Sequence, residues 1–357
     1  MNRLGQTRSQ AARGRFLLAV LAAALLLGPW LIPEYRPTAP AGVPLEAVSG
    51  VAWRHDDHAE VAHFLESLRL HDGVLCLGTS ETTSLPGGNW PDFLNGVEPR
   101  FAVLAGAGRT AGVHLPVLAQ HADQLRGLQL IYYINPVYWN AEHGPINPTY
   151  WTRYVDPLLL GGSGDLPAAI ARPIAEGRAA LPLPQRFNPA GLLRRARKAW
   201  FKDLRGWVAS KPLGTPIRPW EGEPPTAPDP RTDFERGVRA DFHHDAWFKP
   251  VASDPAVLEA RTAELQGFIA ACAEWGIEAT FILGPFNAPF VRSHAPEAEA
   301  GYVRLQADLA QILSASPFPW IDGRDLNDTP GAFRDHQHHS SYGAAQIAEK
   351  TLAHDAF

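Results

Sequence analysis

A serine at the end of an apolar run is the first residue that could do chemistry. Ser80 lies in "GVLCLGTSETTSLPGG", directly after the apolar stretch and before Glu81. Open parallel sheets place their active sites at the carboxyl ends of their strands, where this serine falls. Serine is also common at strand ends and helix N-caps. Glu81 could orient a loop, repel the wrong substrate, or be a solvated or capping acid. The position alone leaves a catalytic and a structural role open.

A second set of candidate residues lies near the C-terminus, in "FRDHQHHSSYGAAQIAEK". Here two residues separate Asp335 from His338. A hydroxyl is a poor nucleophile at neutral pH, so it needs a base that accepts its proton and a carboxylate that orients that base. A loop that carries both groups needs only to approach Ser80 in space. We therefore predict Ser80 as the nucleophile, His338 as the base and Asp335 as its carboxylate partner.

The histidines beside His338 leave two alternatives open. Because His336 and His339 adjoin it, His338 is also consistent with one of several exposed histidines, and Asp335 with the cap of a turn. Three histidines within four residues also suggest a metal site, but this spacing does not place a full ligand set on one element. We expect no metal and no cofactor, because in acyl transfer the acyl group arrives already activated.

Acyl transfer also needs hydrogen-bond donors for the oxyanion. The segment "LAGAGRTAG" offers the backbone of Gly106 or Gly108, and Asn135 offers a side-chain amide after the next apolar run. Each signal is weak alone, since glycines after strands usually make turns and an Asn-Pro pair usually starts one. We predict Gly106 and Asn135 as the donors, with Gly108 as the alternative glycine.

All these candidates follow apolar runs that have the character of buried strands. Five such runs lie near Val74, Arg100, Leu128, Glu278 and Pro317. Their apolar character is continuous rather than alternating, which indicates strands covered on both faces. Helical patterns separate several of them, for example over residues 254–276, where Asp254 can N-cap and Gly276 suits the exit. Alternating helices and strands predict a parallel α/β sheet.

The order of these blocks resembles the SGNH hydrolase superfamily. Serine, glycine, asparagine and Asp-x-x-His occur after the first, second, third and fifth apolar runs. The resemblance implies a three-layer α/β/α, flavodoxin-like fold with a five-stranded parallel sheet. It also implies the family's nucleophile, oxyanion donors and Asp-His pair at Ser80, Gly106, Asn135, Asp335 and His338.

Within that superfamily the chain resembles the DltD family, membrane-anchored proteins of the D-alanylation pathway that modifies teichoic acids. The likeness runs from about Leu75 to the C-terminus and is carried by "LGTSET", "YYINPVYW", "ILGPFNAPF" and "RDHQHHSSYGA". It implies a serine O-acyltransferase or esterase that moves a D-alanyl or other acyl group onto an envelope glycan or polyol polymer. The implied partners are a membrane-bound O-acyltransferase and an acyl carrier protein.

Two other functions stay open at this point. A carbohydrate esterase or acetyltransferase acting on exopolysaccharide or peptidoglycan would use the same residues. A non-catalytic scaffold that gathers a carrier protein and a membrane acyltransferase would need only the fold. Nucleic acid is not an expected partner, because 32 basic and 37 acidic residues give a formal charge of -5.

The N-terminal segment has the pattern of a membrane anchor. Residues 1–15 carry four arginines and no acid, and residues 16–32 form an uninterrupted apolar run. This pattern predicts one transmembrane helix with a cytoplasmic N-terminus. A cleaved signal peptide, with "APAG" at residues 39–42 as its cleavage site, is the alternative. Residues 33–48, rich in proline and alanine, are the expected linker, and residues 49–357 the extracytoplasmic, periplasmic domain.

One region of that domain does not continue the α/β pattern. Residues 140–252 are dense in proline, tryptophan and arginine, which predicts an insertion that could form a substrate cleft, a lid or a docking face. Within it, residues 192–207 form a basic segment with a partly apolar helical face. That segment is consistent with a packed surface helix, or with one that contacts anionic lipid or polymer.

Overall fold

The fold was determined as a computed structural model. It describes residues 51–52, 58–83, 88–105, 109–119, 121–139, 215–216, 222–227 and 255–354. The predicted anchor, the predicted linker, the basic segment and most of the predicted insertion lie outside these ranges. Among the helices in the described ranges, none combines the length and the apolar character that a membrane span needs.

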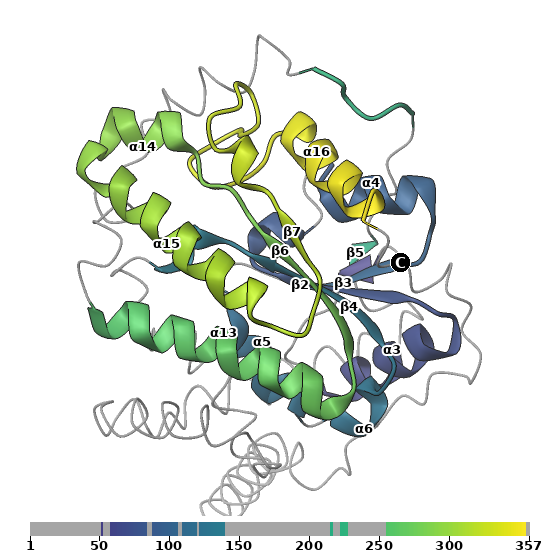
Figure 1. Ribbon diagram of the computed structural model, residues 1–357. Helices are drawn as coiled ribbons and strands as arrows, with labels where there is room; N and C mark the ends of the chain where they lie inside the picture. Colours follow the sequence, from purple (N-terminus) through teal and green to yellow (C-terminus); the bar gives the residue numbers. More distant parts are fainter. Residues whose placement is uncertain are drawn as a thin grey trace, which may run out of the picture. The chain divides into compact units, whose positions relative to one another are not determined.

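A sheet of seven strands forms the centre of the described structure (Figure 1). In chain order the strands are β1 (Val51–Ala52), β2 (Val74–Gly78), β3 (Phe101–Ala105), β4 (Gln129–Ile134), β5 (Thr215–Pro216), β6 (Glu278–Leu283) and β7 (Trp320–Asp322). Their order in space is β5-β1-β3-β2-β4-β6-β7. The five predicted strands are confirmed as β2, β3, β4, β6 and β7, and they form an all-parallel block.

Two short strands extend this block at the β3 edge. β1 pairs parallel with β3, and β5 pairs antiparallel with β1 in the register Ala52↔Thr215. β5 falls inside the predicted insertion, so part of that region belongs to the sheet. The predicted five-stranded parallel sheet is confirmed as the central block, and the two edge strands were not predicted because a strand of two residues carries no readable apolar pattern.

Burial on both faces explains why the central strands are apolar throughout. Every residue of β2 and β3 is buried, and so is all of β4 and β6 after the first residue. Successive side chains of a strand point to opposite faces, so such strands need a helical layer on each side. The continuous apolar runs of the sequence are a direct consequence of this packing.

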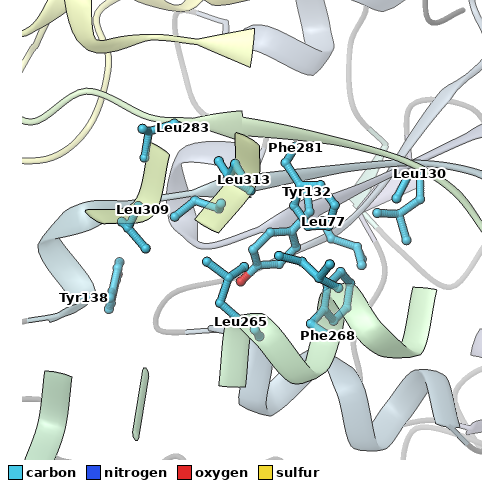
Figure 2. Close-up of a cluster of buried hydrophobic side chains, with 14 of the residues drawn as sticks. Leu77, Leu130, Tyr132, Tyr138, Leu265, Phe268, Phe281, Leu283, Leu309 and Leu313 are labelled. Atoms are coloured by element: carbon cyan, nitrogen blue, oxygen red, sulfur yellow. The ribbon is translucent and has the colours of Figure 1, made fainter. Parts of the chain in front are cut away.

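Helices cover both faces of the sheet (Figure 1). One face packs against α3 (His58–Leu70), α5 (Ala111–Ala119), α6 (Ala122–Leu125), α13 (Pro255–Trp275), α14 (Ala288–His294) and α15 (Pro296–Ser314). The other face packs against α4 (Trp90–Val97) and α16 (Ser341–Leu352). Figure 2 shows part of the larger core, where Tyr132 and Phe281 of the sheet meet Phe268 of α13. The result is a three-layer α/β arrangement.

The predicted helix over residues 254–276 is confirmed as α13. It ends before Gly276, which has a φ of +67°. A left-handed residue after the last turn is a common helix exit, and glycine adopts it without a Cβ penalty. Asp254, the predicted N-cap, lies outside the described residues.

The strand order creates a switch point beside β2. Counted among the five central strands, the order is 2-1-3-4-5. The chain passes from β2 to β3 through α4 on one face, and from β3 back across β2 to β4 through α5 on the other face. Ligands of open α/β sheets bind where the winding direction changes, beyond the carboxyl ends of the strands. The residues that follow β2 and β4 lie at that point.

The first turn of α16 packs tightly on the loop before it, which gives a stability prediction. A Cβ at Gly343 would lie 2.0 Å from the Ala332 carbonyl oxygen. Alanine exceeds glycine in helix propensity by about 1 kcal/mol, so an unhindered position would gain stability from Gly343→Ala. We expect a loss of about 1–3 kcal/mol instead, because the backbones must separate. Urea unfolding of the full-length protein measures this; an unchanged or higher free energy of unfolding would contradict the packing.

Candidate active site

Ser80 begins a tight turn immediately after β2. It is the first residue of the 3-10 turn η1 (Ser80–Thr82) and is 9% exposed. Gly78, the last residue of β2, has a φ of +153°, and a Cβ there would lie 2.3 Å from Thr82 Oγ1. Glycine is therefore needed for the chain to turn back so closely on itself. This turn holds Ser80 at the carboxyl edge of the sheet, at the switch point.

Asp335 and His338 lie on a closed loop between the 3-10 turn η5 (Arg324–Leu326) and α16. Phe333 and His339 form an isolated antiparallel bridge at the ends of this loop. Inside the bridge, the Arg334 N–H donates to the His338 carbonyl at 3.0 Å. These contacts fix the backbone on both sides of the Asp335–His338 segment.

A hydrogen-bonded chain joins this loop to Ser80. His338 Nε2 lies 2.9 Å from Ser80 Oγ, and His338 Nδ1 lies 2.8 Å and 3.0 Å from Asp335 Oδ2 and Oδ1. Asp335 Oδ1 also accepts the backbone N–H groups of His338 at 2.7 Å and Gln337 at 3.0 Å. The structure thus brings the predicted nucleophile, base and carboxylate together, although Ser80 and His338 are 258 residues apart in the chain.

The electrostatics of the pair favour one tautomer of the imidazole. Burial opposes the ionisation of Asp335, but hydrogen bonds from His338 and the charge of His338 hold the pKa of Asp335 well below its usual range. Burial lowers the pKa of His338, but the hydrogen bond to Asp335 and the charges of Glu81 and Asp335 raise it by more. An ionised carboxylate at Nδ1 keeps a proton there, so the Nε2 lone pair faces Ser80 Oγ.

Glu81 is a second carboxylate in the site. It is 1% exposed, and its two oxygens accept hydrogen bonds from the Thr79 hydroxyl and from Asn135 Nδ2. Burial raises the pKa of Glu81, and the nearby charge of His338 lowers it. Asn135, the predicted oxyanion donor, follows β4 and is buried; its Oδ1 accepts the N–H of Val137 at 2.9 Å. Asn135 is therefore linked to the Ser80 turn through Glu81, which takes one of its amide hydrogens.

The predicted glycine donors, Gly106 and Gly108, lie outside the described residues. The chain on either side of them is described. β3 ends at Ala105, which is in register with Gly78 of β2, and the Arg109 guanidinium donates to the Ala105 carbonyl at 2.9 Å. Ala105, which directly precedes the glycine segment, therefore lies beside the end of β2, the strand that leads to Ser80.

Contacts that the sequence analysis did not find hold the loop of Asp335 and His338. Asn287 caps α14: its Oδ1 accepts the Phe290 N–H and its Nδ2 donates to the Asp335 carbonyl, both at 3.0 Å. On the other side, the Tyr133 hydroxyl and His339 Nε2 are 2.6 Å apart. The asparagine before Ala-Pro is a recognisable N-cap pattern, so the role of Asn287 as a cap could have been predicted. No local pattern links Tyr133 to His339, 206 residues away.

The histidines beside His338 are not exposed, so that part of the alternative is wrong, whereas Asp335 does cap the turn through the N–H groups of Gln337 and His338. His336 and His339 are each 5% exposed. Burial, with the nearby charge of His338, lowers the pKa of His339 to about 3, so its ring is neutral at neutral pH. Within the described part of the chain, no three His, Cys, Asp or Glu side chains are grouped so as to hold a metal ion. His339 contacts the rings of Tyr133 and Phe333, and the ring of His336 lies against that of Phe290.

Comparison with known proteins assigns no function to this site. No protein-family model matches the sequence, and a search of curated proteins finds no match. What the site can do therefore follows from its own residues: a hydroxyl, an imidazole and a carboxylate in one hydrogen-bonded chain, with a second carboxylate and an amide beside them.

The pKa values of His338 and His339 are shifted in opposite directions, which a titration can test. We expect the His338 ring to titrate with a midpoint above 6.5, and Asp335→Asn to lower that midpoint, because the hydrogen bond to an ionised carboxylate is lost while burial remains. His339, with a pKa of about 3, should stay neutral from about pH 5 to 9 and serves as an internal control. NMR of ring-labelled histidines in the full-length protein measures both. A His338 midpoint at or below 6.5, or one that Asp335→Asn leaves unchanged, would contradict the electrostatics.

Proposed function

We propose that the chain is a serine O-acyltransferase or esterase that works through an acyl-enzyme on Ser80. The observation that carries this proposal is the unbroken hydrogen-bonded chain from Ser80 Oγ through His338 to Asp335. A serine becomes nucleophilic when a neutral imidazole can take its proton and a carboxylate can stabilise the imidazolium that results. The strand order 2-1-3-4-5, which is that of flavodoxin-like sheets, supports assigning the fold to the SGNH type.

In the first half of the reaction, His338 Nε2 takes the proton of Ser80 as Oγ attacks the carbonyl carbon of an ester or thioester. The tetrahedral intermediate that forms carries its negative charge on the former carbonyl oxygen. When it collapses, the bond to the leaving alcohol or thiol breaks, and His338 returns the proton to that leaving group. Ser80 is left as an acyl ester, and His338 is neutral again.

In the second half, His338 takes a proton from an acceptor hydroxyl or from water. The acceptor oxygen attacks the acyl-serine, a new ester or a free acid forms, and the proton passes back to Ser80 Oγ. Asp335 stabilises the imidazolium in both halves, because its carboxylate remains ionised beside Nδ1.

Donors around Ser80 would stabilise the oxyanion. Asn135 has a second amide hydrogen besides the one that Glu81 accepts. The backbone amide at Ser80 and that of Gly106 are the other donors in the proposal. Donors of this kind contribute most where water is excluded, and the buried surroundings of Asn135 and Glu81 are of that type.

The substrate and the location follow from the resemblance and from the N-terminal pattern. A DltD-type protein would move a D-alanyl or other acyl group onto an envelope glycan or polyol polymer, with a membrane-bound O-acyltransferase and an acyl carrier protein as partners. Residues 16–32 would anchor the chain in the cell membrane with its N-terminus in the cytoplasm and the catalytic domain in the periplasm.

Kinetics on an activated ester test the chemistry. The purified full-length protein should hydrolyse a p-nitrophenyl ester, and Ser80→Ala should lower kcat/KM by about 10³-fold or more. Because the two residues act as a unit, the Ser80→Ala/His338→Ala double variant should be no slower than Ser80→Ala. The wild-type rate should fall as the pH drops through the raised pKa of His338, since the base must be neutral.

A matched control is available at the opposite end of the same strand. His71 lies in the turn before β2, away from Ser80, so His71→Ala should leave the ester rate unchanged. If Ser80→Ala retains the wild-type rate, the nucleophile is assigned wrongly.

Complementation distinguishes the enzyme from a scaffold. In a strain that lacks the gene, the wild-type chain should restore the acyl groups of an envelope polymer and Ser80→Ala should not. Loss of D-alanyl esters in the deletion strain would support the DltD-type substrate, and loss of acetyl esters would replace it with that of a carbohydrate acetyltransferase. Full acylation by the Ser80→Ala chain would count against catalysis altogether.

A further inference from the structure

Glu81 is a buried carboxylate, and burying a carboxylate costs free energy. This cost points to a role for the residue in the site. It is 1% exposed, and no lysine or arginine pairs with it among the described residues. An ionised carboxylate without a cationic partner is expensive to remove from water, and burial raises the pKa of Glu81 accordingly. Its hydrogen-bond partners, Thr79 and Asn135, are neutral. A glutamine of the same shape would pack there at lower electrostatic cost.

The position of Glu81 connects two strand ends across the switch point. Thr79 follows β2, and Asn135 follows β4, the neighbouring strand. The Asn135 side chain is held at both ends: Oδ1 accepts the Val137 N–H at 2.9 Å, and Nδ2 donates to Glu81. An amide nitrogen has two hydrogens, so this pair of contacts leaves one of them and fixes its direction. Without Glu81, among the hydrogen bonds of the described residues, the one from the Val137 N–H would remain to orient the Asn135 side chain.

We propose that Glu81 is a positioning residue for acyl transfer, which holds the Asn135 amide in the orientation of an oxyanion donor and places a negative charge beside His338. This inference rests on the proposed function. Donor position matters because a displacement of about 1 Å can cost about 10²-fold in rate. Charge matters because His338 becomes an imidazolium at the moment Ser80 attacks, and a second anion nearby stabilises that state.

Among the described residues, three ionisable groups interact electrostatically with Glu81. His338 and Asp335 lie on the loop before α16, and Tyr133 lies on β4. The charge of Glu81 raises the pKa of His338 and, with burial as the larger cause, contributes to a raised pKa of Tyr133. Asp335 opposes the ionisation of Glu81, whereas protonated His338 favours it. Glu81 and His338 therefore stabilise each other's charged forms.

Two conservative variants separate position from charge. Glu81→Asp keeps the charge but is one methylene shorter, so it no longer reaches Asn135; we expect kcat on the p-nitrophenyl ester to fall about tenfold or more, with KM nearly unchanged. Glu81→Gln keeps an acceptor for Asn135, and the Thr79 hydroxyl can accept from its amide; we expect kcat at high pH to fall less than for Glu81→Asp, because the donor keeps its orientation and only the charge that stabilises the imidazolium is lost. The acidic limb of the rate profile should stay in place for Glu81→Asp and move to lower pH for Glu81→Gln.

A double-mutant cycle with Asn135→Ala tests whether Glu81 acts through Asn135. If Glu81 acts through Asn135, adding Glu81→Asp to Asn135→Ala should lower kcat by less than about twofold. Equal losses in the two backgrounds, or Glu81→Asp with the wild-type kcat, would overturn the positioning role. An acidic limb that Glu81→Gln leaves unmoved would overturn the charge role.

The outcome also separates this inference from the function on which it rests. If the wild-type protein neither hydrolyses the ester nor is acylated on Ser80, the proposed function fails. If the wild type is active and the Glu81 variants behave as wild type, only the role of Glu81 fails. A merely structural role would lower the free energy of unfolding in both variants without the split between kcat and the acidic limb.

Discussion

The hydrogen bond between His338 Nε2 and Ser80 Oγ is the contact that the rest of the site depends on. It joins the end of the first central strand to the loop before the last helix, so it forms only if both backbones are held firmly. Gly78 allows the chain to turn sharply into Ser80, and Gly343 lets α16 approach the carbonyl of Ala332. Asn287 secures the loop through the Asp335 carbonyl. The packing of these backbones therefore determines whether the hydrogen bond between Ser80 and His338 can form.

Two carboxylates, Asp335 and Glu81, act on the imidazole of His338. Asp335 contacts His338 directly and stays ionised, while Glu81 is buried beside the serine and is linked to Asn135. Both charges raise the pKa of His338 against the effect of burial. A base of raised pKa accepts a proton from serine more readily, but it must be neutral at the working pH. A higher pKa of His338 increases its affinity for the serine proton but lowers the fraction of neutral imidazole at a given pH. We therefore expect the site to work at pH values above the pKa of His338.

The sequence predicted those parts of the fold that repeat a pattern. The strands and α13 are visible because burial on two faces requires continuous apolar runs and because Gly276 ends the helix. Of the hydrogen-bonded chain, Ser80 was found because it follows one of these strands, and Asp335 and His338 because of their Asp-x-x-His spacing. The two-residue strands carry no pattern, and contacts such as those of Tyr133 with His339 or of Asn135 with Glu81 join side chains far apart in the chain. Such pairings depend on how the strands are ordered in the sheet.

Labelling of Ser80 tests the central claim most directly. The full-length protein is treated with a serine-directed fluorophosphonate, digested, and mapped by mass spectrometry, with His338→Ala treated in parallel. The hydrogen-bonded chain predicts a single phosphonyl adduct on Ser80 of the wild type and its absence from His338→Ala, because the hydroxyl is activated only through the imidazole. A folded wild-type protein that carries no adduct on Ser80, or equal labelling of the two proteins, would contradict the account.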